Sequence, residues 1–298
     1  MIPLYDNNME VVPYSHKFRD AWDEFVSNSC NGTYYHTRTF IDDSFFSDAS
    51  IMGVMNHKVV FVFPCCLVDG EYWSHKGATF GGPVVNDTCV TFLHSMCEKI
   101  KTWYGCTPKC RIAGGHWGSV NTTLCYLLGP RVKLELCYVV NTADNWIVKN
   151  KDNRRLLMKD INIIETQKYY EFFYEKLKEK LNEKHHVDPT HTKENFINVF
   201  IPKVPHTLYT SWREKEYQGG VLAIRASKQS WYIAYITPGK GVYKIMQQIT
   251  IDARREGVQY IDYGVVTESN GDILNVGLAK FKQDSYGGLP AFRYLVSF

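Results

Sequence analysis

Hydrophobic residues recur at helical spacing in one segment of the second half of the chain. They occupy positions i, i+3, i+4, i+7 and i+11, which are Val242, Ile245, Met246, Ile249 and Ala253. This spacing predicts an amphipathic helix that ends near Gly257. Residues 230–237 before it and 258–266 after it are rich in β-branched and aromatic residues, which predicts strands. A strand, a helix and a strand in this order favour a mixed sheet with the helix crossing over one face.

The same criteria predict further elements in the second half of the chain. Apolar positions at helical spacing predict three helices: residues 168–184, a segment from Thr192 toward Pro202, and residues 272–283. Strand-like runs lie at 206–213, 220–226 and 291–297. The predicted order is therefore α-α-β-β-β-α-β-α-β.

The first half shows a weaker form of this pattern. Predicted helices lie around Phe18 to Val26, near 37–46 and at 88–104, and predicted strands at 50–56, 58–67, 109–113 and 132–140. A charged stretch, NKDNRR, follows at 150–155. We therefore predict an α/β fold of two similar domains, residues 1–150 and 151–298.

Length and composition are those of a globular protein with a substantial core. A chain of 298 residues, 45% hydrophobic and 22% charged, is long enough for two domains. A net charge of +3 neither requires nor excludes a nucleic-acid or phosphorylated partner. The nine cysteines all lie between Cys30 and Cys137, an odd and uneven set that suggests free thiols in a reducing compartment. With no signal-peptide pattern and no apolar run of membrane-spanning length, we expect a cytoplasmic protein without a membrane span.

The segment TPGKG, residues 237–241, joins a predicted strand to a predicted helix. Main-chain N–H groups and the helix dipole favour an anion at such a turn, and Lys240 adds a positive charge. The segment lacks the spacing of a Walker phosphate-binding loop and the longer GxGxxG pattern. From the residues alone, it is either an anion site or a tight corner with a solvated lysine.

Other catalytic and metal-binding motifs are absent from the sequence. Cys106 and Cys110 lack a second pair of ligands at suitable spacing, so we predict no metal. The sequence contains no GxSxG nucleophile motif. The segment EKLKEKLNEK balances lysine with glutamate, which is typical of a solvated helix and not of a nucleic-acid surface.

The predicted order of elements resembles the core of the GNAT superfamily of N-acyltransferases. In that family the pyrophosphate of coenzyme A lies on the turn between the fourth strand and the third helix, and TPGKGVYKIM, residues 237–246, stands at the matching position. The resemblance implies acetyl-CoA or another acyl-CoA as co-substrate. It also implies that a backbone N–H of the fourth strand polarises the donor carbonyl. The implied donor-binding residues are Tyr235, Ile236, Thr237, Gly239, Lys240, Gly241 and Val242; alternatively, the N–H groups of Tyr235 and Ile236 only pair within the sheet.

A narrower resemblance covers most of the chain. YYHTRTFID (34–42), SHKGATFGGPVV (74–85), NRRLLMKD (153–160) and YIDYGVVTESNGDILNVGLAKFKQDSYGG (260–288) are similar to the FemAB-type, BioF2-like branch, in which two GNAT-like halves stand in tandem. This resemblance implies that Lys282 lies beside the donor phosphates or the reacting carbonyl, and that Arg154 and Arg155 hold a phosphorylated or acidic acceptor. A surface lysine and a charged linker are the alternatives. Aminoacyl-tRNA is the alternative donor, although no extended basic surface favours tRNA.

Acyl transfer to an amine also needs a proton acceptor and a group that protonates the leaving group. Asp262 and Tyr263 lie on the strand predicted to diverge from the fourth strand, and partial burial there would raise the pKa of a carboxylate. Glu268 is a second candidate base, and Tyr286 is a candidate acid. Each also has a structural alternative: a hydrogen-bonded strand-end aspartate, a solvated acid or a core tyrosine.

Candidate acceptor-binding residues lie in the first half. His75, within the glycine-rich segment 74–85, and the pair Tyr35 and His36 are predicted to contact the acceptor, a small-molecule amine or a glycan- or cell-envelope-linked amine. A structural histidine and packing at a helix entrance are the alternatives. The competing function class is a GNAT-like protein that binds a phosphorylated sugar or a partner without catalysis.

Overall fold

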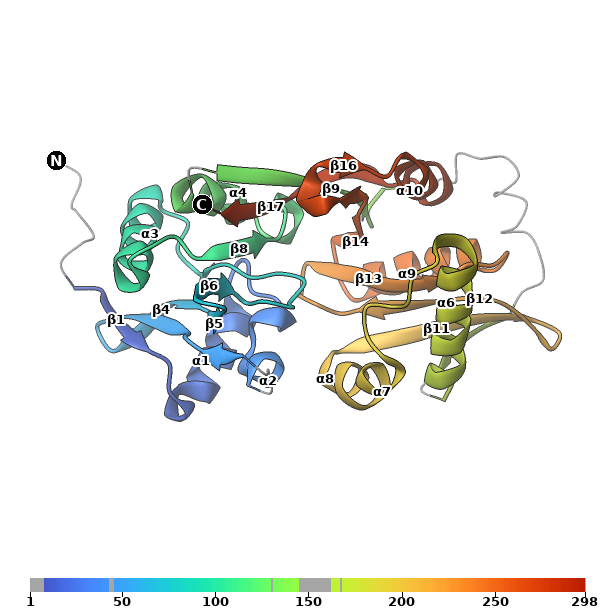
Figure 1. Ribbon diagram of the computed structural model, residues 1–298, viewed down its shortest axis with the longest axis horizontal. Coiled ribbons are helices and arrows are strands. Elements are labelled where there is room, and N and C mark those ends of the chain that lie inside the picture. The colour runs from blue at the N-terminus through green and yellow to red at the C-terminus, as the bar shows by residue number, and fades with distance from the viewer. Residues whose placement is uncertain (1–7, 43–45, 130, 145–161, 167, 298) are drawn as a thin grey trace. The chain divides into compact units, whose positions relative to one another are not determined.

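The computed structural model describes residues 8–42, 46–129, 131–144, 162–166 and 168–297. The chain forms two compact units (Figure 1). The first comprises Met1–Leu136, Thr267–Ile273 and Ala291–Phe298, and the second comprises Cys137–Val266 and Leu274–Pro290. The predicted linker, residues 150–155, lies outside the described residues.

The first unit contains a four-stranded antiparallel sheet in the order β1-β3-β4-β7. Helix α1 packs on one face, where Trp22 and Val26 meet Met52 and Val62. Phe61 and Phe63 belong to a second core with helix α3. Because adjacent residues of a strand point to opposite faces, these two cores cover the two faces of the sheet. The elements are β1 (Glu10–Pro13), α1 (Arg19–Asn28), β3 (Ile51–Met55), β4 (Lys58–Phe63), β7 (Val84–Val85) and α3 (Val90–Tyr104).

A second set of short strands in the first unit surrounds β8. Strand β8 pairs in parallel with β6 and antiparallel with β17. The remaining elements are η1 (His16–Phe18), η2 (Tyr34–His36), α2 (Arg38–Ile41), β2 (Ser47–Asp48), β5 (Cys66–Val68), β6 (Glu71–Ser74), β8 (Lys109–Ile112), η3 (Gly115–Trp117), α4 (Val120–Leu128), β15 (Thr267–Glu268), η5 (Ser269–Gly271), β16 (Ile273–Leu274) and β17 (Leu289–Ser297).

The sheet of the second unit has the order β10-β11-β12-β13-β14-β9. All neighbouring strands are antiparallel except β13 and β14, which run parallel and are connected through helix α9. This confirms the predicted parallel pair with a crossover helix and the mixed α/β fold class. The elements are β9 (Arg131–Asn141), β10 (Asn162–Thr166), β11 (His206–Arg213), β12 (Glu216–Ile224), β13 (Ser230–Thr237), α9 (Val242–Arg255) and β14 (Tyr260–Val265).

Helices cover both faces of this sheet. Leu208 and Leu222 pack against Phe173 of helix α6. The neighbouring Tyr209 points the other way and donates a hydrogen bond to Asp252 of α9, 3.2 Å away. The helices on the α6 face are α6 (Tyr170–His185), α7 (Lys193–Asn195), η4 (Phe196–Phe200) and α8 (Ile201–Lys203).

Two helices of the structure differ in detail from the helices predicted from the sequence. The helix expected from Thr192 is divided into α7, the π-helical turn η4 and α8. The helix expected over 272–283 begins only at Val276, as α10 (Val276–Lys280), and continues as the π-helical turn η6 (Phe281–Ser285). In the described part of the chain, no helix is both long and apolar enough to cross a membrane.

Candidate active site

The parallel strands β13 and β14 of the second unit pair over only three residues each. The last pair joins Tyr232 to Asp262, although β13 continues to Thr237 and β14 to Val265. Alternate main-chain groups of a strand face its two neighbours. Beyond Tyr232, every second residue of β13 therefore directs its main-chain N–H and C=O toward β14, which no longer pairs with it there. We call the Tyr232–Asp262 pair the divergence point.

Strand β13 carries a bulge directly beyond the divergence point. Leu222 of β12 opposes Tyr235, but the next residue, Ala223, opposes Ile233, so Ala234 is an extra residue. A bulge bends its strand and changes the direction of nearby main-chain groups. The predicted N–H donors of Tyr235 and Ile236 follow this bulge directly.

Strand β14 is irregular at the same level. Against β9, the pair Asp262–Val139 is followed by Val265–Cys137, so β14 carries one residue more than its partner. Gly264 has a φ of 79°, which a residue with a side chain adopts only with strain. The Asp262 carboxylate accepts the Gly264 N–H at 2.6 Å. A side chain of β14 itself, Asp262, therefore stabilises the bulge.

Lys282 holds the same bulge from outside the sheet. It belongs to η6, is only 6% exposed, and its Nζ donates to the carbonyl oxygens of Gly264 and Val265 at 3.0 and 2.9 Å. Asp262 is fully buried. The structure therefore brings together Asp262 and Lys282, two of the predicted catalytic residues, around one turn of backbone.

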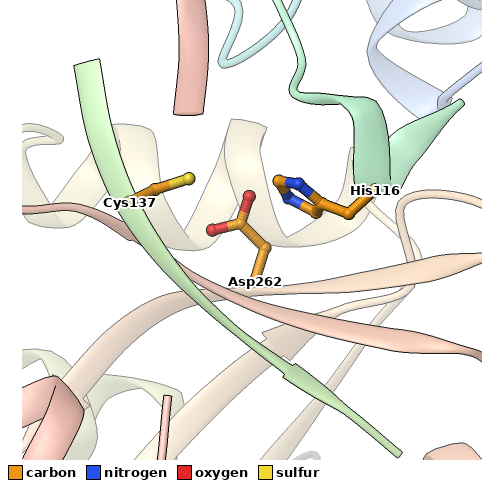
Figure 2. A group of neighbouring side chains, drawn as sticks. All are labelled: His116, Cys137 and Asp262. Atoms are coloured by element: carbon orange, nitrogen blue, oxygen red, sulfur yellow. The ribbon is translucent and has the colours of Figure 1, made fainter. Parts of the chain in front are cut away.

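Cys137 of β9 also lies close to Asp262, as Figure 2 shows. The thiol sulfur and the carboxylate lie within 4.8 Å of one another. Two such groups alone are fewer than the three or four protein ligands of a zinc site, and the carboxylate already accepts the Gly264 N–H. His116, which Figure 2 also labels, belongs to the first unit, where it lies in η3 after β8.

The predicted donor-binding turn lies at the far end of β13, and its tip is exposed. Pro238, Gly239 and Lys240 are all exposed. The inner side is tightly packed, because a β-carbon on Gly239 would lie 2.1 Å from the carbonyl oxygen of Gln218. A β-carbon on Gly241 would lie 2.1 Å from Ser211 Oγ. Both glycines therefore fit closely against the β11–β12 hairpin behind the turn, whether or not an anion binds in front.

Two of the predicted amides already have main-chain partners. Gly241 N–H donates to Gln218 O at 2.8 Å, and Val242 N–H to Gly239 O at 3.3 Å. The first helical bond of α9 comes from Ile245 N–H to Gly241 O at 3.1 Å. The turn therefore leads directly into the regular hydrogen bonds of α9.

Solved structures provide the comparison that decides the fold. The sequence matches no protein-family model and no curated protein. FemX is similar with a TM-score of 0.66 and 13% identity, over 96% of this chain and 97% of that one. A conserved protein of unknown function from Bacteroides thetaiotaomicron (0.58, 12%) covers 97% and 100% of the two chains, and L-PGS from Bacillus licheniformis (0.55, 11%) covers 93% and 90%. The chain has a GNAT-like fold of the FemAB type.

This finding confirms the predicted resemblance; the correspondence of β13 and α9 to the fourth strand and third helix of the GNAT-like fold stays a prediction. Tyr286 lies beside them, fully buried, with ring centroids 5.4 Å from Tyr263 and 5.8 Å from Tyr243 of α9. Burial raises the pKa of Tyr286 well above 10, so its phenol stays protonated. Glu268 belongs to the first unit, where it is exposed on β15.

The predicted acceptor residues of the first unit are buried in or against the loop segment 74–85. Tyr35 is 2% exposed and packs edge-on against Phe80 at 5.7 Å. His36 interacts through Nδ1 with Thr33 N and Oγ1, at 3.1 and 2.8 Å, and also bonds the Gly81 backbone. Burial lowers the pKa of His36 to about 4, so the ring is neutral at pH 7.

His75 lies in the same loop and is 6% exposed. Burial lowers the pKa of His75 to about 4 as well. Its Nδ1 is buried and makes no hydrogen bond within the described residues. Arg154 and Arg155, the other predicted acceptor contacts, lie outside the described residues.

Sequence analysis missed three features of this site: the Ala234 bulge, the Gly264 bulge and Tyr232. Gly264 gave the one usable signal, because a glycine inside a strand pattern often marks a bulge. Alanine and tyrosine are ordinary strand residues, and nothing in the pattern distinguished Ala234 or Tyr232 from their neighbours.

Proposed function

We propose that this protein is an N-acyltransferase that moves an acyl group from acyl-CoA to an amine, such as a sugar- or cell-envelope-linked amine. The observation that carries the proposal is the arrangement of β13 and β14. Two parallel strands stop pairing at Tyr232 and Asp262, both are bulged directly beyond that point, and an exposed turn ends the first of them.

The donor phosphates are assigned to the exposed turn after β13. Lys240 supplies a positive charge, and the turn lies at the positive end of the α9 dipole. Because α9 has 14 residues, its dipole is that of a full helix. The thioester then lies along β13, with its carbonyl oxygen at an N–H near Tyr235 or Ile236.

In the reaction the acceptor nitrogen loses two protons, the leaving sulfur gains one, and a C–N bond replaces the C–S bond. The acceptor ammonium first loses a proton to Asp262, and the neutral nitrogen attacks the thioester carbon. The carbonyl oxygen becomes an oxyanion, which the β13 N–H and the positive charge of Lys282 stabilise. The C–S bond then breaks, and the coenzyme A thiolate takes a proton, for which Tyr286 is the candidate donor. The nitrogen gives its second proton to the Tyr286 phenolate, which leaves a neutral amide and restores the phenol.

The first experiment measures donor binding and proton transfer separately. Acetyl-CoA should raise the melting temperature of the protein, because a ligand of the folded state stabilises it. In a transfer assay with an amine acceptor, Asp262→Asn should lower the rate and remove the limb of the pH profile on which the catalytic base loses its proton. An unchanged rate and profile would remove Asp262 from the mechanism. No thermal shift with any acyl-CoA would remove coenzyme A as the donor.

Aminoacyl-tRNA is the second candidate donor. The observation in its favour is that Gly241 and Val242, two of the amides assigned to a pyrophosphate, already bond main-chain carbonyls. The GNAT pattern that this turn resembles has an arginine or glutamine at its front, where this chain has Thr237 and Pro238. An RNA minihelix with an aminoacylated 3′ adenosine tests this donor directly. If neither donor reacts, the remaining function is that of a non-catalytic binding protein.

A further inference from the structure

Tyr232 extends from one of the diverging strands to the other. It is the last residue of β13 that pairs with β14. A β-carbon built on Gly264 of β14 would lie 3.3 Å from the Tyr232 hydroxyl oxygen and 3.4 Å from Cε2 of the same ring. The end of the tyrosine ring therefore lies directly against the β14 bulge.

The space at this point is also bounded by Lys282. The same hypothetical β-carbon would lie 3.7 Å from Lys282 Nζ. Contacts of 3.3–3.7 Å mean that the room left between Gly264, Tyr232 and Lys282 is about that of a single methyl group. Tyr232 is only partly exposed, so its ring is packed against the protein on at least one side.

We propose that Tyr232 closes the inner end of the space that receives the donor's acyl group, and so limits the length of that group. This inference rests on the proposed function, since it assumes that the reacting carbonyl lies near Tyr235 or Ile236. An acyl chain that runs from this carbonyl back along β13 meets the Tyr232 ring at the divergence point.

The spacing along β13 gives an approximate length limit. Tyr235 lies three residues beyond Tyr232, but because of the Ala234 bulge these three residues span only two residues of β12, which is about 7 Å along the sheet. An extended carbon chain advances about 1.2 Å per bond, so about five bonds fit in that distance. The protein should accept acyl chains up to about six carbons and discriminate against longer ones.

The test compares tetradecanoyl-CoA with acetyl-CoA as donors for the same amine acceptor. The wild-type protein should show a kcat/KM for tetradecanoyl-CoA at least about tenfold below that for acetyl-CoA. Tyr232→Ala removes the ring and should raise the ratio of the two values at least about tenfold. Tyr232→Phe keeps the ring, so this ratio should stay within about twofold of wild type. If only aminoacyl minihelices react, the same ratio is measured for phenylalanyl and glycyl donors.

Control variants keep the result interpretable. Tyr260→Ala removes a partly exposed tyrosine from the paired part of β14 and should not raise the ratio. If Tyr232→Ala fails to fold, as judged by its thermal melt, Tyr232→Leu replaces it. Transfer with an unchanged ratio in the folded variant would overturn this inference alone. The absence of transfer by the wild type with every donor would overturn the proposed function, and this inference with it.

Discussion

Arg38 of the first unit and Lys282 of the second are both buried cations, and they are held in different ways. In the first unit, Arg38 is 1% exposed and lies 2.6 Å from carboxylate oxygens of both Asp42 and Asp48. Its guanidinium also lies 3.6 Å from the ring centroid of Tyr14. In the second unit, Lys282 is 6% exposed, and its ammonium donates to two main-chain carbonyl oxygens of the β14 bulge.

The difference indicates different tasks for the two charges. Arg38 is neutralised by carboxylates and fixed by the planar geometry of its guanidinium, which is typical of a structural ion pair. The carbonyl oxygens of Gly264 and Val265 hold the Lys282 ammonium beside the divergence point, where a positive charge would stabilise a developing oxyanion. We therefore expect Arg38 to act mainly on stability and Lys282 mainly on rate.

The largest expected effect is on catalysis, from Lys282→Met. If the ammonium stabilises the oxyanion, its loss should lower kcat about 100- to 1000-fold, as when one preorganised donor is removed. The free energy of unfolding should fall by less than about 2 kcal/mol, because removal of a buried charge offsets the two lost hydrogen bonds. The measurements are steady-state kinetics and urea denaturation.

Lys280→Met is the matched control, since Lys280 is exposed and two residues away. It should change kcat by less than about threefold. A Lys282→Met variant that keeps its full rate would make Lys282 a structural residue like Arg38.

The opposite pattern is expected for Arg38→Met. This change leaves Asp42, whose side chain is 11% exposed, without its buried partner, and should lower the free energy of unfolding by about 3 kcal/mol. Protein that remains folded should keep its kcat. Arg19→Met is the control, because Arg19 is 47% exposed and 3.6 Å from Asp42, and it should change stability by less than about 1 kcal/mol. Equal losses of stability in the two variants would contradict the structural role.

The buried histidines of the first unit add a pH dependence to its stability. His36 and His75 have pKa values lowered to about 4 by burial, against an ordinary value of 6.5. Below pH 6.5 the unfolded chain therefore binds protons that the folded chain does not. Their contribution is complete above pH 6.5 and is lost as the pH falls toward 4. Each can add up to about 1.4 kcal/mol per pH unit to the slope in this range.

Urea denaturation between pH 4.5 and 7.5 measures this slope. His75→Leu should roughly halve the part of the slope that the two histidines supply, whereas His94→Ala, on the exposed side of α3, should leave it unchanged. A slope in His75→Leu equal to that of wild type would mean that His75 takes up its proton in the folded state.

The sequence predicted the parts of the site that depend on local periodicity. The strand, turn and helix over 230–253 follow from hydrophobic spacing and from the glycines of the turn, and the structure has them at these positions. The parallel pairing of β13 and β14 followed from their order along the chain. Local patterns of this kind are determined by neighbouring residues, which the sequence displays directly.

The bulges could not be predicted, because they depend on partners distant in sequence. The Gly264 bulge is held by Lys282, 18 residues later, and is defined against Val139 and Cys137 of β9. The shift at Ala234 appears only in the register with β12. Short strands such as β7 and β10 were missed for a related reason, since a few residues give too little periodicity to distinguish a strand from a loop.

The smallest expected effect comes from a change at Lys240, a cation that is exposed, unlike Arg38 and Lys282. If it faces the donor phosphates, Lys240→Ala should raise the KM for acyl-CoA about three- to tenfold and leave kcat nearly unchanged, because an exposed charge adds binding but no specific transition-state contact. The increase should shrink at 0.5 M salt, where screening weakens exposed charges. Lys228→Ala, an exposed lysine before the start of β13, is the control and should not change KM. If Lys240→Ala leaves the KM unchanged at low salt, this turn does not contact the donor. The candidate site would then consist of the two strand bulges and the Lys282 ammonium beside them.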